Sequence, residues 1–189
     1  MMVNPEGSSV ASRIQMMVVD YDFFTTYNIA FIAGRDFAPE RPTDTGDLTN
    51  TDQQARLKLI LNASAARALG LEAQGAIDSK LLLPDFEVEG TLMGVVDDTM
   101  FESIHSAARP LVFILSPPQQ ENLMGFRSGV IKLRADAAEA AFTHLEQTWN
   151  QLYPDQRLEW RYLDDDFQAR YQAEEKQRQL LTWFSALAV

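Results

Sequence analysis

Short apolar runs rich in Val, Ile and Leu recur along this chain, and they constrain its fold more than any other feature. They lie at residues 10–19, 29–33, 57–61, 79–83, 86–96, 109–115, 129–135 and 157–163. The shorter runs, of five to seven residues, predict strands because helices usually need about ten residues or more. The two longer runs predict strands for other reasons: residues 10–19 are rich in Val, Ile and Met, and residues 86–96 begin with alternating apolar and polar residues. In the longest run, Gly90 and Gly94 predict a bend or bulge.

The segments between these runs predict three helices. Asp20 is a candidate N-cap for a short helix with Phe23 and Phe24 on its apolar side. Asn62 is a candidate N-cap for a second short helix, and Gly70 fits the position after its end. An N-cap explains Asn62 better than glycosylation of the Asn-Ala-Ser pattern that it begins.

The third helix has the clearest pattern. Asp136 and Glu139 have the spacing of a capping box. Apolar residues then recur at intervals of three and four, at Ala138, Phe142, Leu145, Trp149 and Leu152.

The order of elements is β-α-β, then a β-rich middle, then β-α-β-α. Two β-α-β units commonly share one sheet with both helices on one face. We therefore expect an α+β fold in which residues 1–46 and 117–179 form one discontinuous domain. A small β-rich subdomain, residues 47–116, is inserted into it.

Composition excludes several classes of function. The net charge is −11 and the pI is about 4.5, so nucleic acid and anionic lipid surfaces repel the chain. There are no cysteines, which excludes disulfides, thiolate zinc sites and cysteine nucleophiles.

No motif for catalysis or cofactor binding occurs. The sequence has no phosphate-binding loop, dinucleotide fingerprint, nucleophile elbow or His-Glu-x-x-His pair. The only histidines are His105 and His144, far apart in the sequence. Two acidic clusters, residues 97–98 and 164–166, fit a turn and a helix start. We expect no catalytic residue, cofactor or metal, and a structural ion pair for Arg35 in the Gly-Arg-Asp-Phe turn.

The end of the chain predicts a helix that changes character. Residues 164–179 are polar, whereas residues 180–189 contain no charge and follow Lys176 and Arg178. One interpretation is a buried core helix. We favour the start of a transmembrane helix at 180–189, about half the ~20 residues that a full span needs. The candidate coupling stalk consists of Phe167, Tyr171, Leu180, Leu181, Trp183 and Phe184.

Five blocks resemble, in order, the MacB-type periplasmic core domain. They are "VVDYDFFTTYNIAFIAGRDF" (18–37), "LILNASAARALGL" (59–71), "VEGTLMGVVDD" (88–98), "RPLVFIL" (109–115) and "LDDDFQARYQAEEKQRQLL" (163–181). The resemblance covers residues 10–189, and Asp78 stands where it leads us to expect a glycine.

The resemblance implies the extracytoplasmic domain of an FtsX-like ABC transporter permease in the bacterial cytoplasmic membrane. It identifies residues 1–46 and 117–179 with a porter-like subdomain and residues 47–116 with a Sabre-like one. It also implies a second permease copy, a cytoplasmic ABC ATPase and a periplasmic adaptor or substrate protein as partners. By resemblance to the best-understood members of that family, we expect a mechanotransmitter that serves efflux, lipoprotein release or cell-wall control.

Two other functions are compatible with parts of the pattern. A ligand-binding sensor domain of a membrane receptor would also lie between two membrane helices. A hydrolase would need convergent carboxylates or histidines, which the sequence does not pair. The complete gene separates the first two, because a permease has three further membrane helices and a sensor has one followed by a signalling module.

Overall fold

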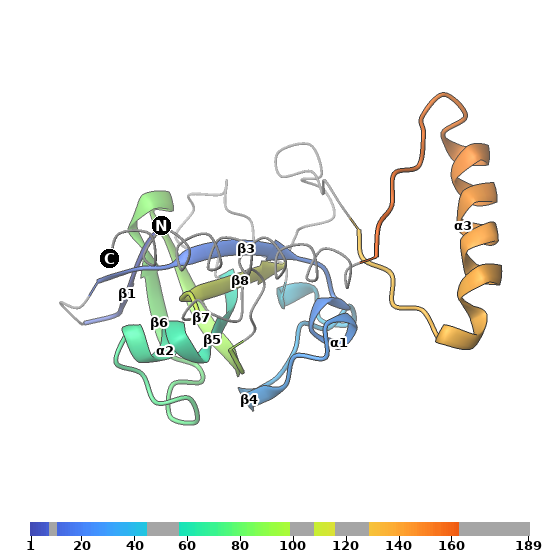
Figure 1. Ribbon diagram of the computed structural model, residues 1–189. Helices are drawn as coiled ribbons and strands as arrows, with labels where there is room; N and C mark the ends of the chain where they lie inside the picture. The colour runs from blue at the N-terminus through green and yellow to red at the C-terminus, as the bar shows by residue number, and fades with distance from the viewer. Residues whose placement is uncertain (8–10, 45–56, 99–107, 116–128, 163–189) are drawn as a thin grey trace, which may run out of the picture. The chain divides into compact units, whose positions relative to one another are not determined.

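The computed structural model describes residues 1–7, 11–44, 57–98, 108–115 and 129–162 (Figure 1). The chain divides into two compact units. Described residues up to Ile131 belong to the first and those from Lys132 onward to the second.

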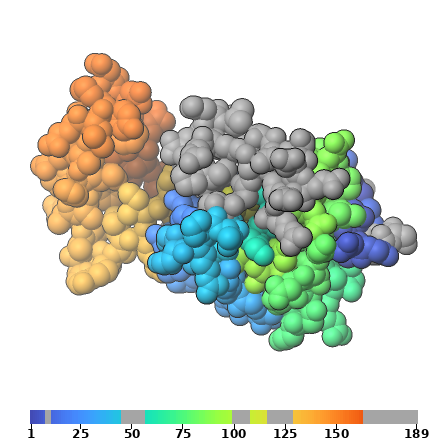
Figure 2. Space-filling model, turned by 180° about the vertical axis from the view of Figure 1, so that it is seen from behind, coloured from blue at the N-terminus to red at the C-terminus, as the bar shows by residue number. Residues whose placement is uncertain are grey.

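A mixed sheet forms the first unit. Its described strands are β1 (Met2–Pro5), β2 (Ser12–Arg13), β3 (Gln15–Val19), β4 (Phe31–Gly34), β5 (Leu57–Asn62), β6 (Lys80–Leu83), β7 (Val88–Val96) and β8 (Leu111–Leu115). They are ordered β2-β1-β6-β7-β5-β8-β3, and β4 pairs with β7 beyond the part that β6 occupies. The pairs β3–β8 and β5–β7 are parallel, and the other pairs are antiparallel. Figure 2 shows the dark-blue N-terminal segment beside the green region that includes β6, in agreement with the β1–β6 pairing.

The centre of this sheet is covered on both faces. Alternate residues of β5 and β8 divide between two apolar clusters, because successive side chains of a strand point to opposite faces. Helix α2 (Ala63–Ala68) packs Ala65 and Ala66 into one cluster. Helix α1 (Phe23–Thr26) packs Phe24 into the other, with its ring centroid 5.0 Å from that of Phe113.

Strand β7 contains a bulge where glycine predicted one. Leu59 of β5 lies opposite Leu92, but Ile60 lies opposite Gly94, so one residue of β7 is extra. The apolar clusters record the same irregularity, since Leu92 and Val95 share a face although they are three residues apart. Gly90 allows close approach, because a Cβ there would lie 2.4 Å from Leu59 Cδ1.

The strands predicted between residues 57 and 115 are confirmed, as are β3 and β4 within the two earlier runs. Strand β1 was missed. Asp20 was predicted as the N-cap of α1, which is wrong. Its carboxylate accepts from Tyr21 N–H, and the capping position is Asp22, without a side-chain cap bond.

The sheet takes strands from both sides of residue 46. Strand β3 pairs with β8, and β4 pairs with β7. The domain boundaries at 46 and 117 stay predictions. Strands that precede residue 46 and strands that follow it pair in the same sheet. The coarser prediction of a mixed α+β fold is confirmed.

The second unit contains a 3₁₀ turn, η3 (Ala135–Ala137), and helix α3 (Ala138–Leu152), which was predicted. Trp160 packs on Phe142 with ring centroids 4.1 Å apart. None of its described side chains is buried, and the large apolar residues Leu152, Trp160 and Tyr162 are exposed.

Three predictions for this region are wrong. Residues 129–135 and the described part of 157–163 are not strands. Their apolar pattern specifies a side-chain face, but a strand also needs a ladder of backbone hydrogen bonds with a neighbouring strand, and these segments take part in none of the strand pairs of the described structure. The capping box does not form either, because Asp136 pairs with Arg134 and the N-cap is Ala137.

Within the described residues, no helix combines the length and hydropathy that crossing a bilayer requires. The candidate stalk (Phe167, Tyr171, Leu180, Leu181, Trp183 and Phe184) and the predicted transmembrane start lie outside the described residues.

Candidate functional site

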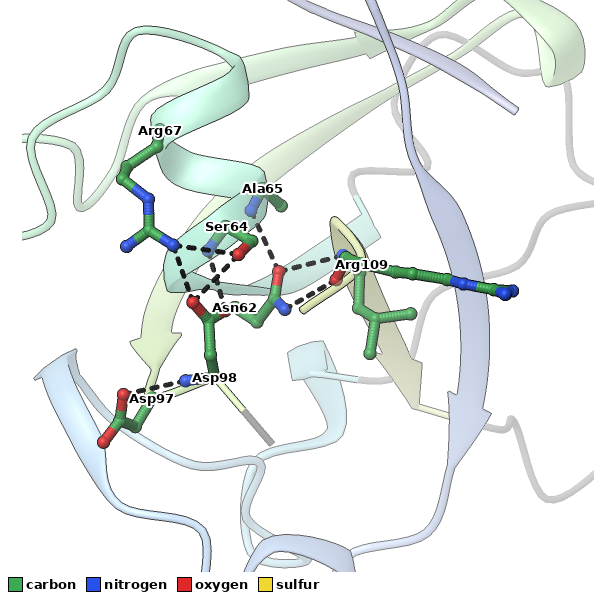
Figure 3. Close-up of polar contacts among 8 residues, drawn as sticks. Asn62, Ser64, Ala65, Arg67, Asp97, Asp98 and Arg109 are labelled. Atoms are coloured by element: carbon green, nitrogen blue, oxygen red, sulfur yellow. Dashed lines mark hydrogen bonds and ion pairs between the residues drawn. The ribbon is translucent and has the colours of Figure 1, made fainter. Parts of the chain in front are cut away.

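Among the described residues, an extensive polar cluster lies where β5 and β7 end and β8 begins (Figure 3). These ends meet at one edge because β5 is parallel to β7 and antiparallel to β8. Four side chains form the cluster together with backbone groups of Ala65, Arg109 and Leu111. They are Asn62, Ser64, Arg67 and Asp98, and we call the whole the Asn62–Asp98 network.

Asn62 is the buried centre of the network, with 1% of its surface exposed. Its Oδ1 accepts from Ala65 N–H at 2.9 Å, which is the predicted N-cap of α2. The same oxygen accepts from Leu111 N–H at 2.9 Å, and Nδ2 donates to Arg109 C=O at 2.8 Å. One amide therefore joins the end of β5, the start of α2 and the start of β8. Its burial and engagement also exclude it as a glycan acceptor in this conformation.

Asp98 holds the other side of the network. Its Oδ1 accepts from Ser64 N–H at 2.8 Å, and its Oδ2 accepts from Ser64 Oγ at 2.8 Å. Arg67 Nη2 donates to the same Oδ2 at 2.7 Å and to Ser64 Oγ at 2.9 Å. The Oδ1 of the preceding residue, Asp97, accepts from Asp98 N–H.

These contacts determine how Asp98 titrates. Burial alone would raise the pKa of Asp98, but the hydrogen bonds from Ser64 and Arg67 and the positive charge of Arg67 outweigh burial. The pKa therefore lies below its usual range, and Asp98 is a carboxylate at neutral pH.

A second, smaller cluster fixes the turn after β4. Arg35 donates to both carboxylate oxygens of Asp44, at 2.6 and 2.7 Å, and Ala38 N–H donates to Asp44 at 3.1 Å. Burial acts to raise the pKa of Asp44, but these hydrogen bonds lower it below its usual value. The structural ion pair predicted for Arg35 is confirmed, and its partner is Asp44.

The geometry of both clusters is that of structural joints. In the Asn62–Asp98 network, the Ser64 hydroxyl donates to the Asp98 carboxylate and accepts from the Arg67 guanidinium. His144 lies exposed on α3, and His105 is outside the described residues. The described residues contain no group of three or more His, Asp or Glu placed to hold a metal.

Sequence patterns identified the members of the network singly and did not connect them. Asn62 was predicted as a cap, and the structure confirms it. The turn predicted at residues 97–98 stays a prediction, because the residues that follow Asp98 lie outside the described part of the chain. The link between Asp98 and Arg67 was missed, because it spans 31 residues of sequence. Asp78, where the resemblance favours glycine, has a φ of 66°, in the left-handed region that glycine adopts freely.

Solved structures show where this fold occurs. A domain of a putative permease protein from Porphyromonas gingivalis aligns with 82% of this chain at 13% identity and a TM-score of 0.51. The extracellular domain of the noncanonic ABC-type transporter YknZ from Gram-positive bacteria aligns with 82% at 9% identity and the same TM-score. The periplasmic region of MacB from Actinobacillus actinomycetemcomitans aligns with 79% at 13% identity and a TM-score of 0.43.

The chain spans 63% of the MacB region, 65% of the P. gingivalis domain and 73% of the YknZ domain. No protein-family profile matches it, and no curated protein matches it significantly. At these identities the likeness concerns the fold. The fold is shared with a domain of a putative permease and with the extracellular domain of an ABC-type transporter, in agreement with the sequence resemblance.

Proposed function

We propose that this chain is the extracytoplasmic domain of an ABC transporter permease and that it transmits ATP-driven conformational change across the membrane. The observation that carries the proposal is the fold shared with the P. gingivalis permease domain and the YknZ extracellular domain. Because fold does not by itself imply function, the internal construction of the domain must also suit this role.

A domain that transmits motion must keep its shape under load. The described sheet has a continuous buried centre, since every residue of β8 is buried and β5 is buried at five of its six positions. The Asn62–Asp98 network and the Arg35–Asp44 pair use their polar groups to join segments of the chain. Both features support a mechanical role over an enzymatic one.

The proposal includes partners and a location. We place the parent protein in the bacterial cytoplasmic membrane, with this domain on the periplasmic or extracytoplasmic side. A second permease copy, a cytoplasmic ABC ATPase and a periplasmic adaptor or substrate protein are the proposed partners. We further propose the porter-like and Sabre-like division and a coupling stalk that continues into a membrane helix at residues 180–189.

Motion can be tested with a single spin label, because this chain contains no cysteine. Gln74 is exposed in the first unit, so Gln74→Cys provides an attachment site. The full-length permease, with any other cysteines replaced, would be reconstituted with its ATPase in liposomes. We expect the distance between labels on two copies to change when ATP is added.

An ATPase variant that binds but does not hydrolyse ATP is the control, because it separates a binding-driven step from the complete cycle. Unchanged label distances during active ATP hydrolysis would contradict mechanotransmission. Labelling the same cysteine with a membrane-impermeant maleimide in spheroplasts tests the location independently. Protection of Gln74→Cys until lysis would contradict an extracytoplasmic domain.

A further inference from the structure

The Asn62–Asp98 network holds two points that are close in space and separated along the chain. Asp98 follows the end of β7, while Arg109 and Leu111 mark the start of β8. Both points are bound to the first turn of α2 or to its cap, one through Ser64 and the other through Asn62. Asn62 and Ser64 are only two residues apart.

We propose that the network is a mechanical bracket that makes the end of β7, the start of β8 and helix α2 move as one body. In this bracket Asp98 is a positioning residue. It acts through α2 on the start of β8, which it does not itself contact in the network. The inference goes beyond the proposed function, because such coupling can be measured in the isolated chain.

The sheet ladders do not supply this coupling to α2. They already join β5 to β7 and to β8. Within α2 itself the buried side chains are the small Ala65 and Ala66, and the larger Leu69 packs at the C-cap, at the opposite end from Ser64. Small apolar side chains resist sliding weakly, because they neither interlock deeply nor have a preferred direction. Ser64 N–H donates to Asp98 and Ala65 N–H donates to Asn62, and these two directional hydrogen bonds fix both the position and the orientation of the helix start.

Charge strengthens the Asp98 side of the bracket. Two of its three bonds come from Ser64, and the third is the ion pair with Arg67, whose side chain is 68% exposed. An exposed ion pair alone contributes little to stability, so the two hydrogen bonds from Ser64 to the Asp98 carboxylate supply most of the connection.

Amide hydrogen exchange on the full chain, followed residue by residue by NMR, tests the bracket. Asp98→Ala removes the carboxylate that accepts from Ser64 N–H and Ser64 Oγ. We expect exchange to accelerate at Ser64 and, by at least about fivefold, at Leu111 N–H on the other side of the network. Asp97→Ala is the matched control, because it removes the same charge one residue away without touching α2.

Two additional variants separate coupling from simple destabilisation. Ser64→Thr retains the hydroxyl and should leave the Leu111 rate near that of the parent chain, whereas Ser64→Ala should raise it. If Asp98→Ala does not fold, Arg67→Gln provides a milder perturbation of the same oxygen. Faster exchange at Ser64 with an unchanged rate at Leu111 would overturn the bracket, as would an equal acceleration throughout β1 to β8, which would indicate global unfolding.

Discussion

Replacing Asn62 with alanine tests the central contact of the domain. The substitution removes the N-cap of α2 and the acceptor for Leu111 N–H. Loss of an N-cap typically costs about 1 kcal/mol. A buried donor without a partner costs about 1–3 kcal/mol, and Leu111 is only 5% exposed. We therefore expect the free energy of unfolding of the first unit to fall by about 2–4 kcal/mol.

The assay must report on the first unit. The two described tryptophans, Trp149 and Trp160, belong to the second unit, so their intrinsic fluorescence would follow the wrong part of the chain. Urea denaturation should instead be followed by NMR resonances from β5, β7 and β8. Exchange of the Leu111 amide in native buffer gives an independent measurement of the same loss.

Asn150→Ala is the matched control, since Asn150 is exposed within α3 and alanine favours a helix there. Its effect should stay within about 0.5 kcal/mol. A cost for Asn62→Ala of less than about 1 kcal/mol would refute the reasoning, because it would mean that neither the cap nor the Leu111 contact stabilises the fold.

Three further predictions concern the first unit. Because the folded pKa of Asp44 lies below its ordinary value, its stabilising effect is complete above about pH 4 and is lost as the pH falls further. Urea midpoints measured against pH should fall more steeply for the parent than for Asp44→Asn, and parallel curves would contradict this. Gly34→Ala should cost more than about 3 kcal/mol, since φ is +75° and the new Cβ would lie 2.1 Å from Met93 O. Gly70→Ala, with φ +69° and open space around it, should cost only about 1 kcal/mol, and equal urea midpoints for the two variants would show that the contact at Gly34 relaxes freely. Asp78→Gly should raise the free energy of unfolding by about 0.5 kcal/mol, and the urea midpoint with it, because glycine relieves the positive φ; a lower midpoint would mean that the aspartate side chain stabilises this turn.

Local sequence signals predicted the features whose cause is local. The N-cap of α2 needs only Asn62 and a backbone N–H three residues later. Gly70, just after the C-cap of α2, has the positive φ that ends many helices. Arg35 and Asp44 are nine residues apart and close one turn. In each case the interaction is determined within a few residues, so the pattern was sufficient.

Pairing partners were less accessible from the sequence. Apolar alternation identified β7 and also suggested strands at 129–135 and 157–163, but among the described residues only β7 of these three is paired with other strands. A period of two specifies which side chains share a face and does not identify the strand that accepts the backbone hydrogen bonds. The same limitation concealed the Asn62–Asp98 network, whose members meet only through the parallel register of β5 and β7.

The bulge in β7 is a local feature that determines a contact between distant segments of the chain. With the extra residue, Asn62 lies opposite Val96, and Asp98 follows two positions later. Without it, Asn62 would lie opposite Val95, and the corresponding position would be Asp97, because a one-residue slip exchanges the faces of a strand. The bulge therefore selects which of two adjacent aspartates reaches Ser64 and Arg67. Gly94 was the local sign of that irregularity, and its consequence is a contact 31 residues away from Arg67 along the chain.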